Sequence, residues 1–179
     1  MKKVLIYFTM IVGIITIIGA CKSDEDDAAA TTSALTCTGT SSGSGPTIGS
    51  VALEEATYLS SCFSSRKLQL EFKNSTSAQY TTFYYGDTSC SGTATSQSNN
   101  GCMESINVSS TRTTKPVYEN GTAGDNATGY ATSATWKHSS DIQYLELSGV
   151  SSSVFWYNQS SSQAGLDSNA LWLFKFTKQ

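Results

Sequence analysis

The sequence predicts an all-β domain, an antiparallel meander of eight or nine strands that closes into a barrel. Serine and threonine are abundant, and both disfavour long helices, because threonine is stiff at χ1 and serine competes for backbone hydrogen bonds. Aromatic residues make up 11% of the chain, while proline occurs only twice. The clearest signal is alternation: Leu68, Leu70 and Phe72 are separated by polar residues, which is the pattern of a strand with one wet face.

The strands are expected at short intervals along the chain. The same alternation recurs at Ile106 and Val108, at Ile142 and Tyr144, and over residues 171–176. Glycine, asparagine and aspartate mark turns at Asn74, 86–87, 99–101, 120–121, 124–126, Gly149 and 165–169. Alternation and turns together predict strands at 56–63, 66–73, 79–85, 92–97, 103–110, 128–137, 141–148, 153–158 and 169–177. Residues 51–59 have an alternative, a short helix that leads into the first strand.

Closure of the sheet follows from its connections. Consecutive strands joined by tight turns pair antiparallel in sequence order. Such a sheet has to remove its two edges, and closing into a barrel does so. A two-sheet β-sandwich is the alternative. Residues 51–179 are assigned to this one domain, which is long enough to bury a core without a metal.

The N-terminus has the features of a secretion signal. Lys2 and Lys3 precede an apolar run over residues 4–18, and small residues follow before Cys21. The run is shorter than the roughly 20 residues that a membrane-spanning helix needs. Residues 1–20 are therefore expected to be a leader that is removed.

Residues 18–21, Ile-Gly-Ala-Cys, resemble the bacterial lipobox. The resemblance implies that Cys21 carries a diacylglycerol on its sulfur and becomes an acylated N-terminus after cleavage. Two or more acyl chains give a stable membrane anchor. The expected location is therefore outside the cytoplasm, on a bacterial membrane, with the outer membrane or the cell surface favoured.

Residues 21–50 are expected to be the lipidated cysteine, an acidic run and a flexible tether rich in Ser, Thr and Gly. Loss of the leader removes Lys2 and Lys3, so 11 − 2 = 9 basic residues face 14 acidic ones and the formal charge is −5. This charge argues against a nucleic-acid partner. The acids at 24–27 are similar to stretches that direct lipoproteins to the surface of some bacteria, or else form a solvated spacer.

Four further cysteines, Cys37, Cys62, Cys90 and Cys102, predict two disulfides in an exported chain, and spacing alone leaves three pairings open. ATYLSSC at 56–62, LQLEF at 68–72 and YYGDTSC at 84–90 resemble the opening of small secreted bacterial β-barrels of lipocalin-like type. The resemblance implies a lipocalin-like barrel with the pairs Cys62–Cys90 and Cys37–Cys102. The alternative pairs Cys90 with Cys102 and Cys37 with Cys62.

Catalytic and metal-binding motifs are not found in the sequence. His138 is the single histidine, and it shares one short stretch with Asp141, whereas the groups of a catalytic triad come from separate elements. No Cys-x-x-Cys pair occurs. We therefore expect neither an enzyme nor a cofactor or metal.

Aromatic residues recur in nearly every expected strand, and two functions remain. A barrel of about eight strands either fills with side chains or holds one small ligand. The first function is a membrane-tethered barrel that binds a small apolar or amphipathic molecule, with Trp136, Tyr144 and Trp156 as candidate lining residues. The second is a surface adhesin or antigen with a filled barrel, whose loops bind a protein partner.

Overall fold

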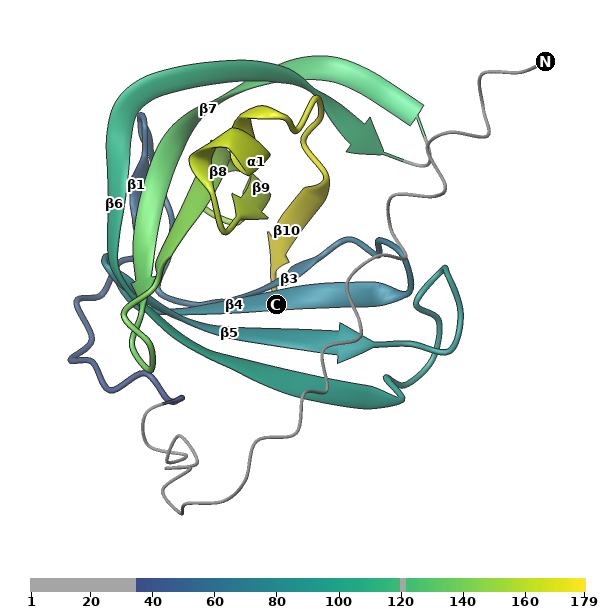
Figure 1. Cartoon of the computed structure of the whole chain (residues 1–179), viewed down its shortest axis with the longest axis horizontal. Helices are drawn as coiled ribbons and strands as arrows, with labels where there is room; N and C mark the ends of the chain where they lie inside the picture. Colours follow the sequence, from purple (N-terminus) through teal and green to yellow (C-terminus); the bar gives the residue numbers. More distant parts are fainter. Residues whose placement is uncertain (1–34, 120–121) are drawn as a thin grey trace, which may run out of the picture.

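Residues 35–119 and 122–179, which are described in a computed structural model, form a closed antiparallel β-barrel (Figure 1). Eight strands of this part pair in the order β10-β3-β4-β5-β6-β7-β8-β9, and β10 closes the barrel between β9 and β3. The all-β meander predicted from alternation is thereby confirmed. The elements are β1 (Thr47–Ile48), β2 (Val51–Ala52), β3 (Thr57–Ser60), β4 (Arg66–Asn74), β5 (Ser77–Tyr84), β6 (Ser96–Glu119), β7 (Thr122–Trp136), β8 (Ile142–Ser151), β9 (Val154–Ser160), α1 (Gln163–Asp167) and β10 (Phe174–Lys178).

One long strand, β6, replaces the two strands expected at 92–97 and 103–110. The turn expected between them is a bulge: Tyr80 pairs with Gly101 and Thr81 with Asn99, so Asn100 is the extra residue. Gly101 has a φ of +113°, a conformation that residues with a side chain rarely adopt. The glycine lets the chain bulge and keep its pairing with β5, whereas a turn would have ended the strand.

Three smaller expectations also need correction. The turn expected at 124–126 lies inside β7, because Asn126 pairs with Pro116 of β6. The alternative helix at 51–59 is absent, since this segment contains β2 and β3. Part of the turn expected at 165–169 belongs to α1, which begins at an N-cap where the Ser162 hydroxyl accepts a hydrogen bond from the Gly165 amide.

The segment before residue 51, expected to be a flexible tether, is attached to the barrel at Cys37 and packs against it from Gly45. β1 and β2 form a hairpin in which Ile48 pairs with Val51. Ile48 and Leu53 are each 1% exposed and belong to the core. Gly149 of β8 lies so close to Val51 that an added Cβ would be 2.7 Å from the valine Cβ. This hairpin closes the end of the barrel at the β8–β9 turn.

Aromatic side chains fill the closed half of the barrel. The Tyr58 ring packs edge-on against Phe72 at 5.7 Å and Phe155 at 5.2 Å, and Phe155 stacks on Phe176 at 5.0 Å. The Tyr58 hydroxyl donates to the Ser152 carbonyl at 2.6 Å and accepts from the Glu54 amide at 2.9 Å. Tyr58 therefore joins the core to the two segments that close this end.

β6 and β7 continue beyond the barrel as a hairpin extension, residues 109–119 and 122–128, which curves around α1, β8 and β9 (Figure 1). Trp172 attaches the extension: its backbone N–H donates to the Pro116 carbonyl at 2.9 Å and its indole N–H to the Ala127 carbonyl at 3.0 Å. The indole lies where a Cβ on Gly129 would be, 2.5 Å away. Only glycine therefore fits at position 129.

The described residues contain two disulfides, Cys37–Cys102 and Cys62–Cys90, which are the pairs implied by the lipocalin-like resemblance. Cys37–Cys102 attaches the N-terminal segment to β6. Cys62–Cys90 joins the chain after β3 to the connection between β5 and β6. Both bonds are consistent with an exported protein.

The two-residue turn between Phe63 and Arg66 offers a stabilising substitution. Ser64 and Ser65 have φ values of 50° and 62°, the left-handed region that this hairpin turn requires and that favours Asn-Gly. Replacing the two serines by Asn-Gly is expected to raise the free energy of unfolding by about 1 kcal/mol, because the turn strain is relieved. Urea denaturation measures the change, and replacing both by alanine, which keeps the strain, is the control. An unchanged or lower stability of the Asn-Gly variant would contradict the expectation.

Candidate functional site

The barrel end opposite the β1–β2 hairpin opens into a hollow of about 430 Å³, here called the mouth. It lies where β4, β8 and β10 begin and where β5, β7 and β9 end. Its volume falls in the range of about 300–1,000 Å³ that is typical of small-molecule sites. The residues that line it are Arg66, Leu68, Tyr80, Thr82, Tyr84, Asn100, Trp136, Gln143, Tyr157, Gln159, Ser160, Ser161 and Phe174.

Aromatic rings form the deep wall of the mouth. Tyr80 and Trp136 face the barrel interior from β5 and β7, with their ring centroids 5.9 Å apart. His138 contacts the indole from the turn that follows, at 5.7 Å. Tyr157, which is fully buried, and Phe174 complete the wall from β9 and β10. Trp136 is only partly buried, so its ring is available to a solute.

Amide and hydroxyl groups are held in place around these rings. The Tyr157 hydroxyl donates to Gln159 Oε1 at 2.7 Å, and Gln159 Nε2 donates to Gln143 Oε1 at 3.1 Å. On the other side the Thr82 hydroxyl donates to Asn100 Oδ1 at 3.0 Å. An amide both donates and accepts hydrogen bonds. The mouth is thereby prepared for a ligand with hydroxyl, amide or carbonyl groups.

The charge of the mouth is positive. Among its described lining residues there is no aspartate or glutamate, and Arg66 is the one charged side chain. Burial raises the pKa of Tyr157 and Tyr80, so both phenols stay neutral at physiological pH. Arg66 forms no ion pair within the described part of the chain. A neutral or acidic ligand fits these charges, and a cationic one does not.

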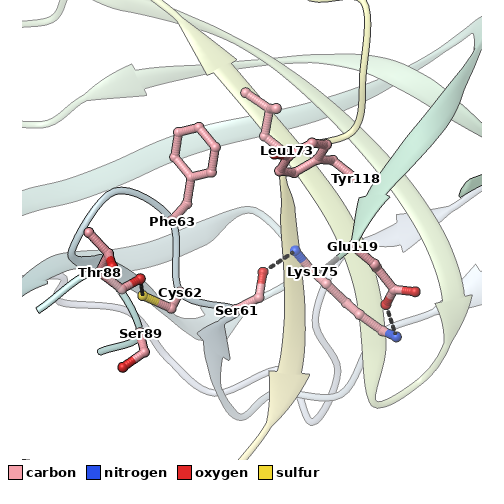
Figure 2. Close-up of a pocket in the computed structure, with 9 residues that line it drawn as sticks. All are labelled: Ser61, Cys62, Phe63, Thr88, Ser89, Tyr118, Glu119, Leu173 and Lys175. Carbon is pink, nitrogen blue, oxygen red and sulfur yellow. Dashed lines mark hydrogen bonds and ion pairs between the residues drawn. The ribbon is translucent and has the colours of Figure 1, made fainter. Parts of the chain in front are cut away.

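A second hollow of about 430 Å³, here called the cleft, is shown in Figure 2. Its residue Leu173 precedes Phe174 of the mouth. Phe63, Tyr118 and Leu173 supply its apolar surface, and hydroxyl groups face it from the opposite side. Lys175 Nζ and Glu119 Oε1 form an ion pair of 2.6 Å, so the two charges in the cleft are paired with each other. The residues that line the cleft are Ser61, Cys62, Phe63, Thr88, Ser89, Tyr118, Glu119, Leu173 and Lys175.

Thr88 and Ser89 lie in a loop that forms one wall of the cleft. Hydrogen bonds to the Asp87 carboxylate hold this loop in place. Asp87 accepts hydrogen bonds from the Ser89 hydroxyl at 2.6 Å and the Ser91 hydroxyl at 2.7 Å. These hydrogen bonds hold the pKa of the Asp87 carboxyl well below its usual range, and the bond from the Ser89 hydroxyl has the largest effect. The Cys62–Cys90 disulfide attaches the same loop to the chain after β3. The cleft wall is therefore fixed at two points.

The structure brings one of the three predicted lining residues into the mouth. Trp136 lies there, but Tyr144 and Trp156 face the outside of the barrel, because their neighbours Leu145, Phe155 and Tyr157 occupy the core. Tyr144 lines a separate outer hollow of about 260 Å³. Trp156 is buried on the outer face, where Lys175 Nζ lies 5.6 Å from its ring centroid. Cys21, the predicted lipidation site, lies outside the described residues.

Sequence reasoning missed the polar half of the mouth. Arg66, Gln143 and Gln159 were not among the predicted lining residues. The sequence does contain an indication for Gln143. It shares every second position of β8 with the core residues Leu145 and Leu147, so its side chain lies on the same inner face of the barrel. A polar residue that lies on the inner face of a strand, close to the end of that strand, is expected to line the opening of the barrel.

His138 and Asp141 lie in the exposed turn between β7 and β8, as the sequence indicated, and His138 contacts Trp136 of the mouth. No group of three or more His, Cys, Asp or Glu side chains able to hold a metal occurs in residues 35–119 and 122–179. Within the same residues, no helix has the length and apolar character needed to cross a membrane.

Comparison with known proteins gives no relative. The chain matches no protein-family model, no curated protein and no solved structure. The barrel and its mouth therefore have to be interpreted from their own geometry.

Proposed function

We propose that this protein is an exported, lipid-anchored binding protein of lipocalin-like type that holds a small amphipathic molecule in the mouth of its barrel. The observation that carries the proposal is the mouth itself: a hollow of about 430 Å³ with aromatic rings, fixed amides and no acid among its described lining residues. The filled half of the barrel restricts the ligand to the open end.

The mouth suits a ligand with one apolar face. Trp136 and Tyr80 offer ring surface, and Gln143, Gln159 and Asn100 lie around it. The rings exclude water from the apolar face of the ligand, which provides affinity. The amides form hydrogen bonds with its polar edge, which fixes its orientation. A wholly apolar ligand would leave the amides without partners when they lose water, at a cost in affinity.

Removal of the Trp136 ring tests the proposal. Native mass spectrometry of the protein purified from its own cells is expected to show a bound mass of a few hundred daltons. In Trp136→Ala the occupancy should fall about tenfold, as expected for loss of one stacked ring. Tyr144→Ala, which removes an aromatic ring from the outer face, is the matched control and should keep the ligand. A wild-type protein without any bound mass would contradict the proposal.

Membrane anchoring through Cys21 is part of the same proposal and has its own test. Cys21→Ser is expected to move the protein from the membrane fraction to the soluble fraction, because the acyl chains supply the anchor. Protease added to whole cells should digest the wild-type protein while periplasmic controls survive, since we propose that it is exposed at the cell surface. Protection from the protease would place the protein on an inner leaflet.

A surface adhesin or antigen remains the second candidate, favoured by the packed interior around Tyr58, Phe72, Phe155 and Phe176. In that case the barrel serves as a rigid support, and loops rich in Ser, Thr and Tyr contact a protein partner. The mass spectrum separates the two candidates. A bare wild-type protein would support the adhesin.

A further inference from the structure

We infer that the mouth and the cleft are two subsites of one elongated site, and that its ligand is a short saccharide chain with an acidic group. This inference rests on the proposed function and deepens it. Each hollow measures about 430 Å³, so the two together offer twice the volume of the mouth alone.

A single aromatic ring separates the two subsites. Phe63 lies in the turn after β3, and its ring centroid is 5.5 Å from that of Phe174, which lines the mouth. The Phe63 ring centroid is also 6.4 Å from that of Tyr118, which lines the cleft. Phe63 is only partly buried, so the divider presents ring surface to a ligand that crosses it. Figure 2 shows the Phe63 ring beside Leu173 and Tyr118.

The lining chemistry on both sides of Phe63 fits a sugar. A sugar ring has C–H groups on its faces, which pack on the electron-rich faces of aromatic rings, and hydroxyls at its edge. Phe63 and Tyr118 offer such faces in the cleft, and Trp136 does so in the mouth. Hydroxyls both donate and accept, as do Ser61 and Ser89 of the cleft and the amides of the mouth.

Arg66 supplies the preference for an acid. It stands at the rim of the mouth, in the hairpin turn that also carries Phe63, where Phe63 and Arg66 exchange backbone hydrogen bonds of 3.0 and 3.2 Å. A guanidinium binds a carboxylate with two parallel hydrogen bonds. The Lys175–Glu119 pair keeps the cleft neutral. The acidic sugar is therefore placed in the mouth, and the rest of the chain extends across Phe63 into the cleft.

The test uses an array of glycans, from single sugars to hexamers, in which uronic acid chains stand beside the same chains as neutral methyl esters. The wild-type protein is expected to bind acidic chains of two or more rings. Phe63→Ala should weaken chain binding about tenfold and leave single acidic sugars unaffected, because the divider contacts only the longer ligands. Phe83→Ala, which removes a phenyl ring on the outer face of β5, should change nothing.

Arg66→Gln should remove the preference for acids over their methyl esters, whereas Lys67→Gln, which removes a neighbouring charge that lies over Tyr85, should keep it. Array binding limited to single sugars, or equal binding of chains by Phe63→Ala, would overturn the elongated site. A bound mass in the native spectrum that is not a carbohydrate would overturn the saccharide and leave the proposed function standing. Absence of both a bound mass and array binding would overturn the two together.

Discussion

Replacing Cys37 and Cys102 together by serine is expected to lower the free energy of unfolding by about 4 kcal/mol. The two residues are 65 positions apart, so the bond greatly restricts the unfolded chain. It also places the N-terminal segment beside β5, where the Cys37 amide donates to Gln79 Oε1 at 2.8 Å. Both cysteines are buried, so two serine hydroxyls would have to find new partners. Urea denaturation of the oxidised protein measures the loss.

The second disulfide is the matched comparison. Cys62 and Cys90 are 28 positions apart, and their replacement by serine is expected to cost slightly less, about 3.5 kcal/mol in the same chain-entropy model. This bond fixes the cleft wall, so its loss should also weaken chain binding, whereas loss of Cys37–Cys102 should not. A cost below about 1 kcal/mol for loss of Cys37–Cys102 would contradict the expectation.

Glu146→Leu is expected to destabilise the protein by about 3 to 5 kcal/mol, because it leaves the ammonium group of Lys115 buried without its carboxylate. Lys115, a residue of the hairpin extension, places its Nζ 2.6 Å from Oε2 of Glu146 in β8. The two side chains are 10% and 5% exposed. Asn158 Nδ2 donates to the same carboxylate at 3.4 Å and to the Leu171 carbonyl at 2.9 Å. The pair thus joins the extension to β8 and β9.

The double variant Lys115→Met, Glu146→Leu is the control for this prediction. Two apolar residues of similar volume remove both charges, and the double variant is expected to lie within about 1 kcal/mol of the wild type. Thermal unfolding of the two single variants and the double variant gives the coupling energy. A double variant as unstable as Glu146→Leu would mean that the loss comes from packing of the extension and not from an unpaired charge.

The barrel could be predicted from the sequence because each strand buries one face. Leu68, Leu70 and Phe72 alternate with polar residues, and this periodicity alone indicates a strand and its inner face. The length of β6 could not be predicted in this way. An Asn-Asn-Gly sequence is a strong turn signal, and its role as a bulge depends on pairing with β5 that local residues do not show.

The hairpin extension was missed for a related reason. Its residues are mostly small or polar and exposed, so no inward apolar series marks them as strand. The contact that holds them, Trp172 against Gly129, joins residues that are distant in sequence. Residues 37–50 contain few apolar residues, so the burial of Ile48 could not be predicted from the sequence either.

The candidate site was predicted in part. Trp136 was identified because it is aromatic, and the same reasoning wrongly placed Tyr144 and Trp156 in the mouth. Successive side chains of a strand point alternately to the inner and the outer face of the barrel. Leu145 is buried on the inner face, so its neighbour Tyr144 lies on the outer face. The cleft could not be predicted, since Phe63 and Tyr118 are brought together only when the extension curves back over the barrel.

The most direct test of a ligand-binding mouth is a crystal structure of the protein purified from its own cells. We expect electron density for an ordered molecule against Trp136, with polar atoms within hydrogen-bond distance of Gln143 or Gln159. Density that contains only water in the mouth, or an ordered molecule in the outer hollow beside Tyr144, would contradict the account.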